Sequence, residues 1–275
     1  MCEVVSDGSV VACGDAREFS FLSHLKVGSF IGLPQMIVNY PKILRAPWDG
    51  IPDTLLIAEE GPVKANPAYQ QAKTGDVAAA KTLAADFVGP PALDALQRLV
   101  GEQGIILVPV HAFEDQGINR IPAAFAELLA SRLGLSVATG VVQGNVVSHT
   151  GSTGWQRMAR PPVFDGPVTA GAGFLLVDDF IGQGGTLANL RGYLIANGGK
   201  VAGAVTLTGK AYSAKLSLDV ATLRQLRQKH DSELEAWWEE TFGYGFDCLT
   251  ESEARYLIRA ENADTIRARI IEARS

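Results

Sequence analysis

Residues 174–186 read Phe174-Leu-Leu-Val-Asp-Asp-Phe-Ile-Gly-Gln-Gly-Gly-Thr186, an apolar run followed by two acids and a glycine-rich turn. The run from Phe174 to Val177 is typical of a buried strand in a parallel sheet. Asp178 and Asp179 stand where we expect this strand to end. Open parallel sheets bind ligands at the carboxyl ends of their strands, so the pattern predicts a ligand site at these two carboxylates.

The glycine-rich turn is expected to open a helix. It places Gly182, Gly184 and Gly185 around Gln183, and Thr186 then begins an apolar series at helical spacing. Such a turn directs backbone N–H groups into one concavity, and the helix dipole adds partial positive charge. The lysine of a P-loop and the spacing of a dinucleotide-binding motif are both absent. Two acids beside a phosphate site suit a ligand with hydroxyls and a phosphate, such as a ribose 5-phosphate.

This stretch resembles the signature of the type I phosphoribosyltransferases: an apolar strand, two acids, two apolar residues and a T-G-G-T-like turn. The resemblance implies that Asp178 and Asp179 act on the ribose hydroxyls of phosphoribosyl pyrophosphate (PRPP), and that residues 182–186 bind its 5-phosphate. Gln183 departs from the family pattern, in which Thr is usual, and this loses one hydroxyl contact but keeps the backbone N–H groups. The alternative interpretation is an ordinary strand, turn and helix whose acids cap the helix.

Strand and helix patterns alternate from about Ala92 to Lys210. They predict a helix over 93–100, strands over 105–110, 135–142, 174–178 and 201–208, and helices over 121–133 and from 186. The alternation predicts an α/β fold with a doubly wound, mostly parallel sheet, phosphoribosyltransferase-like by the resemblance. We expect a core domain over 92–210, an N-terminal extension over 1–91 and a C-terminal helical segment over 211–275. By the resemblance, either flanking segment could form the hood that selects the acceptor.

The segment from Val108 to Pro122 resembles the pyrophosphate loop of the competence-protein-type branch of the family. The resemblance implies that Gly117, Asn119 and Arg120 lie near the pyrophosphate, and the planar fork of an arginine suits phosphate oxygens. His111 is a weaker candidate, because a lone loop histidine often only makes a local hydrogen bond. An ordinary surface connection is the alternative.

Residues 143–162 are small, polar or glycine, with little apolar periodicity, which predicts a long mobile excursion. The resemblance implies a flexible catalytic loop here, which would close and exclude water during transfer. Arg157 and Arg160 are candidate catalytic residues that would grip the departing pyrophosphate, and His149 is a weaker candidate for protonating it. An exposed linker with solvated arginines is the alternative.

The flanking segments carry weaker patterns. We expect a hairpin over 4–12, a strand over 54–58, two short helices over 66–87 around Gly75-Asp76 that serve only packing, and C-terminal helices whose Trp237 and Trp238 lie in a core. The Gly209 to Tyr212 run resembles the xanthine and adenine phosphoribosyltransferases. That resemblance implies that Tyr212 could stack on a base.

Composition narrows the class of protein. With 275 residues and 47% hydrophobic residues the chain can bury a sizeable core, and its net charge of −6 argues against nucleic acid as a partner. The three cysteines are odd in number and lack metal-ligand spacing, which fits reduced thiols. No apolar run approaches the roughly 18 to 20 residues of a membrane span, and no targeting segment is recognisable. We expect a cytoplasmic protein with no membrane partner.

The resemblance implies a Mg²⁺-dependent phosphoribosyltransferase. It would move ribose 5-phosphate from PRPP to a small-molecule acceptor, expected to be a nucleobase, and release pyrophosphate. Mg²⁺ would be held through PRPP and not by direct protein ligands. A homodimer is left open. The alternatives are a non-catalytic regulatory protein that binds PRPP or a nucleotide, and a hydrolase that spends either of them on water.

Overall fold

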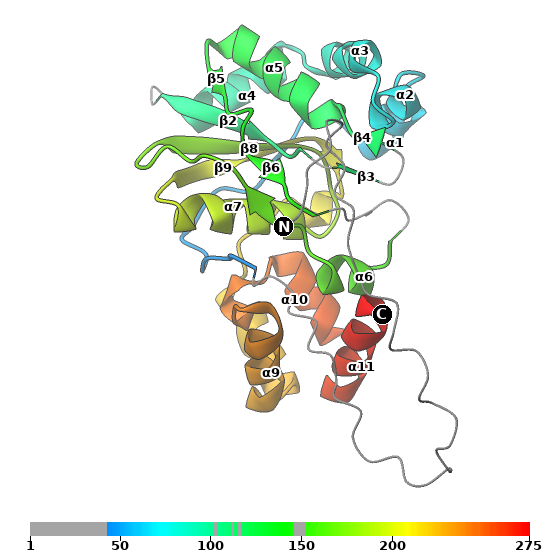
Figure 1. Ribbon diagram of the computed structural model, residues 1–275, viewed down its shortest axis with the longest axis vertical. Coiled ribbons are helices and arrows are strands. Elements are labelled where there is room, and N and C mark those ends of the chain that lie inside the picture. The colour runs from blue at the N-terminus through cyan, green and yellow to red at the C-terminus, as the bar shows by residue number, and fades with distance from the viewer. Residues whose placement is uncertain (1–42, 102–103, 112, 115–116, 146–151) are drawn as a thin grey trace, which may run out of the picture. The chain divides into compact units, whose positions relative to one another are not determined.

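The computed structural model describes residues 43–101, 104–111, 113–114, 117–145 and 152–275 (Figure 1). The described residues belong to one compact unit, residues 41–275. The hairpin expected over 4–12 and the candidate His149 lie outside the described residues.

A five-stranded parallel sheet forms the centre of this unit. Its strands are, in spatial order, β1 (Leu55–Leu56), β9 (Lys200–Gly209), β8 (Gly173–Ile181), β2 (Ile105–Pro109) and β5 (Ser136–Val137). All four pairings in this sheet are parallel. The predicted α/β class with a mostly parallel sheet is confirmed.

Helices cover both faces of the sheet, because β8 is apolar on both sides (Figure 1). Leu175 and Val177 belong to a core cluster shared with helices that precede β8 in the chain, and Phe174 and Leu176 belong to a cluster on the other face. The first group of helices is α1 (Glu60–Ala65), α2 (Tyr69–Lys73), α3 (Val77–Phe87), α4 (Pro90–Val100) and α5 (Ile121–Leu133). The other face is covered by α7 (Gly185–Ala196). This is the layering predicted for a doubly wound sheet.

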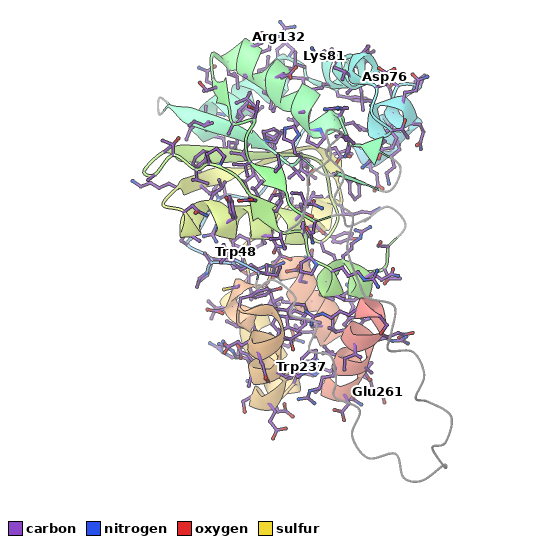
Figure 2. The ribbon with its side chains drawn as sticks, viewed as in Figure 1. Trp48, Asp76, Lys81, Arg132, Trp237 and Glu261 are labelled. Atoms are coloured by element: carbon purple, nitrogen blue, oxygen red, sulfur yellow. The ribbon has the colours of Figure 1, made fainter. Side chains whose placement is uncertain are left out.

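Several predicted elements have the expected bounds. Helix α5 spans the predicted 121–133 and ends at Gly134, whose φ of 68° is left-handed. The two short helices predicted over 66–87 are α2 and α3. They are separated by Gly75, with φ 118°, and by Asp76, whose side chain accepts a hydrogen bond from the Ala79 N–H (Figure 2). Local sequence determines these elements through turn and cap residues.

The predicted end of the central strand is wrong. Strand β8 does not stop at Asp178 but continues to Ile181, because β9 extends to Gly209 and pairs with it throughout. Strand β2 stops earlier: Pro109 pairs with Val177. The two acids therefore lie inside a strand, just beyond the end of the neighbouring strand.

One further prediction needs correction. The strand predicted over 135–142 is two short strands, β5 in the main sheet and β6 (Val142–Gln143), which pairs antiparallel with β7 (Phe164–Asp165). Strand β1 is an edge strand of the main sheet, so the sheet draws on residues before position 92. The domain boundaries proposed at 92 and 210 stay a prediction.

The segment expected to be a mobile excursion contains a helix, α6 (Gly154–Ala159). Thr153 and Gln156 form a reciprocal capping box at its start, and Met158 and Ala159 are buried with the C-terminal helices. The centroids of the Trp155 and Tyr256 rings lie 4.8 Å apart. Residues 152–162 therefore pack against the C-terminal helices and do not form a free excursion. Their few apolar side chains contact residues that are distant in the sequence.

The C-terminal segment has its own core. Its elements are η1 (Ala211–Ser213), α8 (Val220–Lys229), α9 (Ser232–Phe242), η2 (Phe246–Cys248), α10 (Glu251–Ile258) and α11 (Ala263–Arg274). Trp238 is fully buried there, and Trp237, labelled in Figure 2, packs against the same cluster. The predicted core role of this aromatic pair is confirmed. Among the residues that the structure describes, no helix has the length and apolar character to cross a lipid bilayer.

Candidate functional site

A cavity of about 250 Å³ lies where β8 meets the glycine-rich turn and the start of α7. Helices α1, α2 and α6 supply other parts of its wall, and Arg45 and Glu253 reach it from far ends of the described chain. Its lining residues include Lys64, Tyr69, Gln70, Lys73, Asn119, Gln143, Arg157, Asp178, Asp179, Phe180 and residues 181–187. The cavity therefore joins the two features that the sequence singled out, the acid pair and the turn.

The two acids are buried and hydrogen-bonded to each other. Asp178 is 7% exposed and Asp179 6%, and the Asp179 N–H donates to Asp178 Oδ1 at 2.8 Å. On the other side, Lys73 Nζ of α2 lies 3.0 Å from Asp179 Oδ2. Asn119 also hydrogen-bonds to Asp179, and its Oδ1 accepts the N–H of Ile121 at the start of α5.

These surroundings separate the pKa values of the two acids. Burial raises the pKa of Asp178 well above its ordinary value, and the negative charge of Asp179 raises it further. Burial would also raise the pKa of Asp179, but the charge and hydrogen bond of Lys73, with hydrogen bonds from Asp178 and Asn119, lower it. Asp178 therefore holds a proton more readily than Asp179 does. Such a pair can both donate a hydrogen bond to ligand hydroxyls and accept one from them.

The turn leaves the first helical N–H groups of α7 without a side-chain cap. Gly184 is the N-cap residue, with φ 82°, and no side chain caps the helix. A helix start in this state binds anions, because N–H groups and the helix dipole both favour negative charge. A Cβ on Gly185 would lie 2.6 Å from Glu253 Oε1, so glycine is needed there for close packing.

Most of the predicted site residues meet at this cavity. Its lining contains both acids, all five residues of the turn from Gly182 to Thr186, and Asn119. It also contains Arg157 of α6, whose guanidinium occupies the space that a Cβ on Gly182 would need. Burial lowers the pKa of Arg157, and the nearby Tyr212 hydroxyl partly opposes this effect.

The other predicted residues are not among those that line the cavity. Arg160 is exposed at the end of α6, and Tyr212 is 64% exposed. Gly117 lies in β4 (Gly117–Ile118), which pairs with β3 (Phe113–Glu114). Burial lowers the pKa of His111, and the positive charge of Arg120, which lies nearby, lowers it further. Of the two candidate arginines of the loop, Arg157 lines the cavity and Arg160 does not. Likewise, Asn119 lines the cavity and Arg120 does not.

Sequence reasoning missed the contribution of α1 and α2. Lys64, Tyr69, Gln70 and Lys73 line the cavity, although the two short helices over 66–87 were expected to serve only packing. Arg45 and Glu253 were missed as well. No motif marks any of these residues, because they reach the site only through tertiary packing.

No protein-family model matches the chain. It is 40% identical over 237 residues to Protein TraN of Escherichia coli, covering 86% of this chain and 53% of TraN. It is 42% identical over 169 residues to an uncharacterized protein of Haemophilus influenzae, covering 58% of this chain and 38% of that protein. The chain thus spans about half or less of the length of these two curated relatives.

Phosphoribosyltransferases are among the similar solved structures. An adenine phosphoribosyltransferase matches with a TM-score of 0.33 and 16% identity, over 55% of this chain and 76% of that one. The UMP synthase of Leishmania donovani matches with a TM-score of 0.32 and 13% identity, over 66% of this chain and 33% of that one. Likenesses this weak leave the chemistry of the site to be argued from its own residues.

Proposed function

We propose that this protein is a phosphoribosyltransferase. It would move ribose 5-phosphate from PRPP to a small-molecule acceptor, which we expect to be a nucleobase. One observation carries the proposal. The buried acid pair, Asp178 and Asp179, and the uncapped start of α7 line one cavity. A ribose 5-phosphate carries hydroxyls for the first and a phosphate for the second, and the signature over 174–186 resembles this family.

The acids would act on the ribose. In a glycosyl transfer the sugar becomes cationic as the leaving group departs. Asp179 keeps its negative charge at neutral pH because Lys73 and Asn119 hold its pKa low. A charge fixed in a buried site stabilises a developing cation far more than it would in water.

The phosphates would be bound by different groups. The N–H groups at the start of α7 would take the 5-phosphate. Arg157 would interact with the pyrophosphate as it leaves, since its guanidinium lies beside the turn. Nothing in this scheme needs a covalent nucleophile from the protein.

We infer that magnesium enters the site as an ion carried by the donor. Among the residues that the structure describes, no cluster of three or more His, Cys, Asp or Glu side chains could hold a metal. Asp178 and Asp179 nonetheless supply the hard oxygen atoms that Mg²⁺ favours. Mg²⁺ bound to PRPP would neutralise charge on the leaving pyrophosphate.

The ion pair between Lys73 and Asp179 favours one alternative, a regulatory protein that binds PRPP or a nucleotide. The lysine already compensates the charge that would stabilise a ribosyl cation. Pyrophosphate release from PRPP and Mg²⁺, with and without a panel of nucleobases, separates the possibilities. Release that needs a base supports transfer, and release without one indicates a hydrolase. Binding of PRPP without release indicates a regulatory protein and contradicts the transferase.

A further inference from the structure

Two backbone carbonyls of the glycine-rich turn accept short hydrogen bonds from side chains outside the core sheet, and a third lies near an arginine. Ser213 Oγ donates to the Gly182 carbonyl at 2.5 Å, and Thr250 Oγ1 donates to the Gln183 carbonyl at 2.6 Å. Arg45 Nη2 lies 3.5 Å from the Gly185 carbonyl oxygen, at the limit of a hydrogen bond. Ser213 and Thr250 both belong to the C-terminal segment.

These contacts fix the direction of the N–H groups. The described chain contains no cis peptide bond. In a planar trans peptide the C=O of one residue and the N–H of the next point in opposite directions. When Ser213 and Thr250 hold the carbonyls of residues 182 and 183, the N–H groups of Gln183 and Gly184 must point away from the C-terminal segment. The turn then presents amide hydrogens as donors for an anion.

The two hydroxyls are themselves fixed. Ser213 is 1% exposed, and its Oγ lies 2.8 Å from Ser252 Oγ. Since the Ser213 hydroxyl hydrogen is used on the turn, Ser252 must be the donor to Ser213. Thr250 is fully buried, and its Oγ1 accepts the N–H of Glu253 at 3.1 Å. Its one hydroxyl hydrogen is therefore directed at the Gln183 carbonyl.

A buried ion pair connects Thr250 to the start of α7. Glu253 Oε2 accepts the N–H of Thr250 at 2.9 Å, and both Glu253 oxygens accept hydrogen bonds from Arg45, at 2.6 and 2.9 Å. The Arg45 and Glu253 side chains are only 2% and 3% exposed. Arg45 Nε also donates to Asn189 Oδ1 of α7 at 2.7 Å. The C-terminal segment thus has a fixed position against the turn.

We propose that Ser213 and Thr250 are positioning residues of the anion-binding turn, and that the C-terminal segment is therefore an integral part of this site. The inference rests on the proposed function, in which the turn binds a sugar phosphate, and it adds two residues beyond the signature over 174–186. In this role the two hydroxyls contact the backbone of the turn and not the sugar phosphate. They act by fixing the orientation of the peptide planes whose N–H groups would bind the anion.

Ribose 5-phosphate is the probe that tests this role. Thr250→Val keeps the shape of the side chain, but it leaves the Gln183 carbonyl without its donor and removes the cap of α10. Thr250→Ser keeps the hydroxyl. Asp231→Ala is the matched control, because it removes the cap of α9 in the same segment without touching the turn. Ser213→Ala is a second test that involves no cap. Dissociation constants are measured by titration calorimetry at a temperature where every variant is folded.

Thr250→Val and Ser213→Ala are each expected to bind ribose 5-phosphate about tenfold more weakly than the parent. Thr250→Ser is expected to restore binding, and Asp231→Ala to bind like the parent. Parental affinity in both Thr250→Val and Ser213→Ala would overturn the positioning role and leave the proposed function standing. Equal losses in Asp231→Ala and Thr250→Val would also overturn it, because the loss would then come from general destabilisation. A parent protein that does not bind ribose 5-phosphate would remove the proposed function and this inference together.

Discussion

Lys73 Nζ on α2 lies 3.0 Å from Asp179 Oδ2 on β8. This ion pair links α2, which precedes β2 in the chain, to the acid pair of the signature. It also makes the two neighbouring carboxylates unlike each other, since the pKa of Asp179 is lowered while that of Asp178 is raised.

The first prediction removes this lysine. Lys73→Met should lower the free energy of unfolding at pH 7 by about 3–5 kcal/mol, because Asp179 would keep a buried charge without its partner. The lowered pKa of Asp179 means that the pair stabilises the fold above the unfolded value of about 3.9, and that this contribution is lost as the pH falls through the folded pKa. The gap between variant and parent should therefore narrow below about pH 4, as followed by urea denaturation.

Lys81→Met is the matched control for this measurement. Lys81, labelled in Figure 2, pairs with Glu127 at 3.4 Å, but both side chains are about 60% exposed. Such surface pairs contribute roughly 0–1 kcal/mol. Equal losses in the two variants, or a Lys73→Met gap that does not depend on pH, would show that Lys73 does not compensate a buried carboxylate.

The second prediction concerns Asp178. A raised pKa means that the folded state holds a proton more tightly than the unfolded state, so stability is lost as the pH rises from about 3.9 through the folded pKa. Asp178→Asn should therefore melt at a temperature a few degrees above that of the parent at pH 7 and equal to it near pH 4. The same variant should lose on the order of a hundredfold in turnover. Calorimetric melting curves and pyrophosphate release check the two halves, and a variant that is neither more stable nor less active contradicts the assignment.

Local sequence patterns predicted most of the helices and strands of the core, because the residues that determine these elements lie within or beside them. The helix over 121–133 follows from apolar periodicity with Pro122 in its first turn and Gly134 after it. The turn after β8 follows from its glycines. The end of β8 could not be predicted from 174–181 alone, since it depends on the length of β9.

The remainder of the site depends on tertiary contacts. Lys73, Arg45 and Glu253 stand in segments without a motif, and each reaches the cavity through partners distant in sequence. The same holds for α6, whose Met158 packs with C-terminal residues and turns an apparently featureless loop into a docked helix. A single sequence shows the apolar residue in such cases but not the surface that it meets.

The third prediction tests the turn. Gly184→Ala combines a left-handed φ of 82° with a Cβ that would overlap the Leu216 side chain. Gly171→Ala is its control, since Gly171 has φ 79° and nothing within 4 Å of the added Cβ. Both variants should lose about 1 kcal/mol to backbone strain, and Gly184→Ala should lose a further ~1–3 kcal/mol to its overlap with Leu216. Only Gly184→Ala should stop ribose 5-phosphate from raising the melting temperature. Undiminished protection of a folded Gly184→Ala protein would remove the phosphate role of the turn.

The last prediction separates the transferase from the regulatory protein. Arg157 lines the cavity beside Gly182, while Arg160, three residues further along α6, is exposed at its end. Arg157→Ala should lower kcat on the order of a hundredfold with a much smaller change in PRPP affinity, because its contact strengthens as pyrophosphate departs. Arg160→Ala should stay within about threefold of the parent, as surface substitutions usually do. Steady-state pyrophosphate release and the dissociation constant for PRPP are measured on both variants. If Arg157→Ala weakens PRPP binding and leaves turnover of the bound donor unaltered, its contact is made in the ground state only, and the regulatory alternative is favoured over transfer.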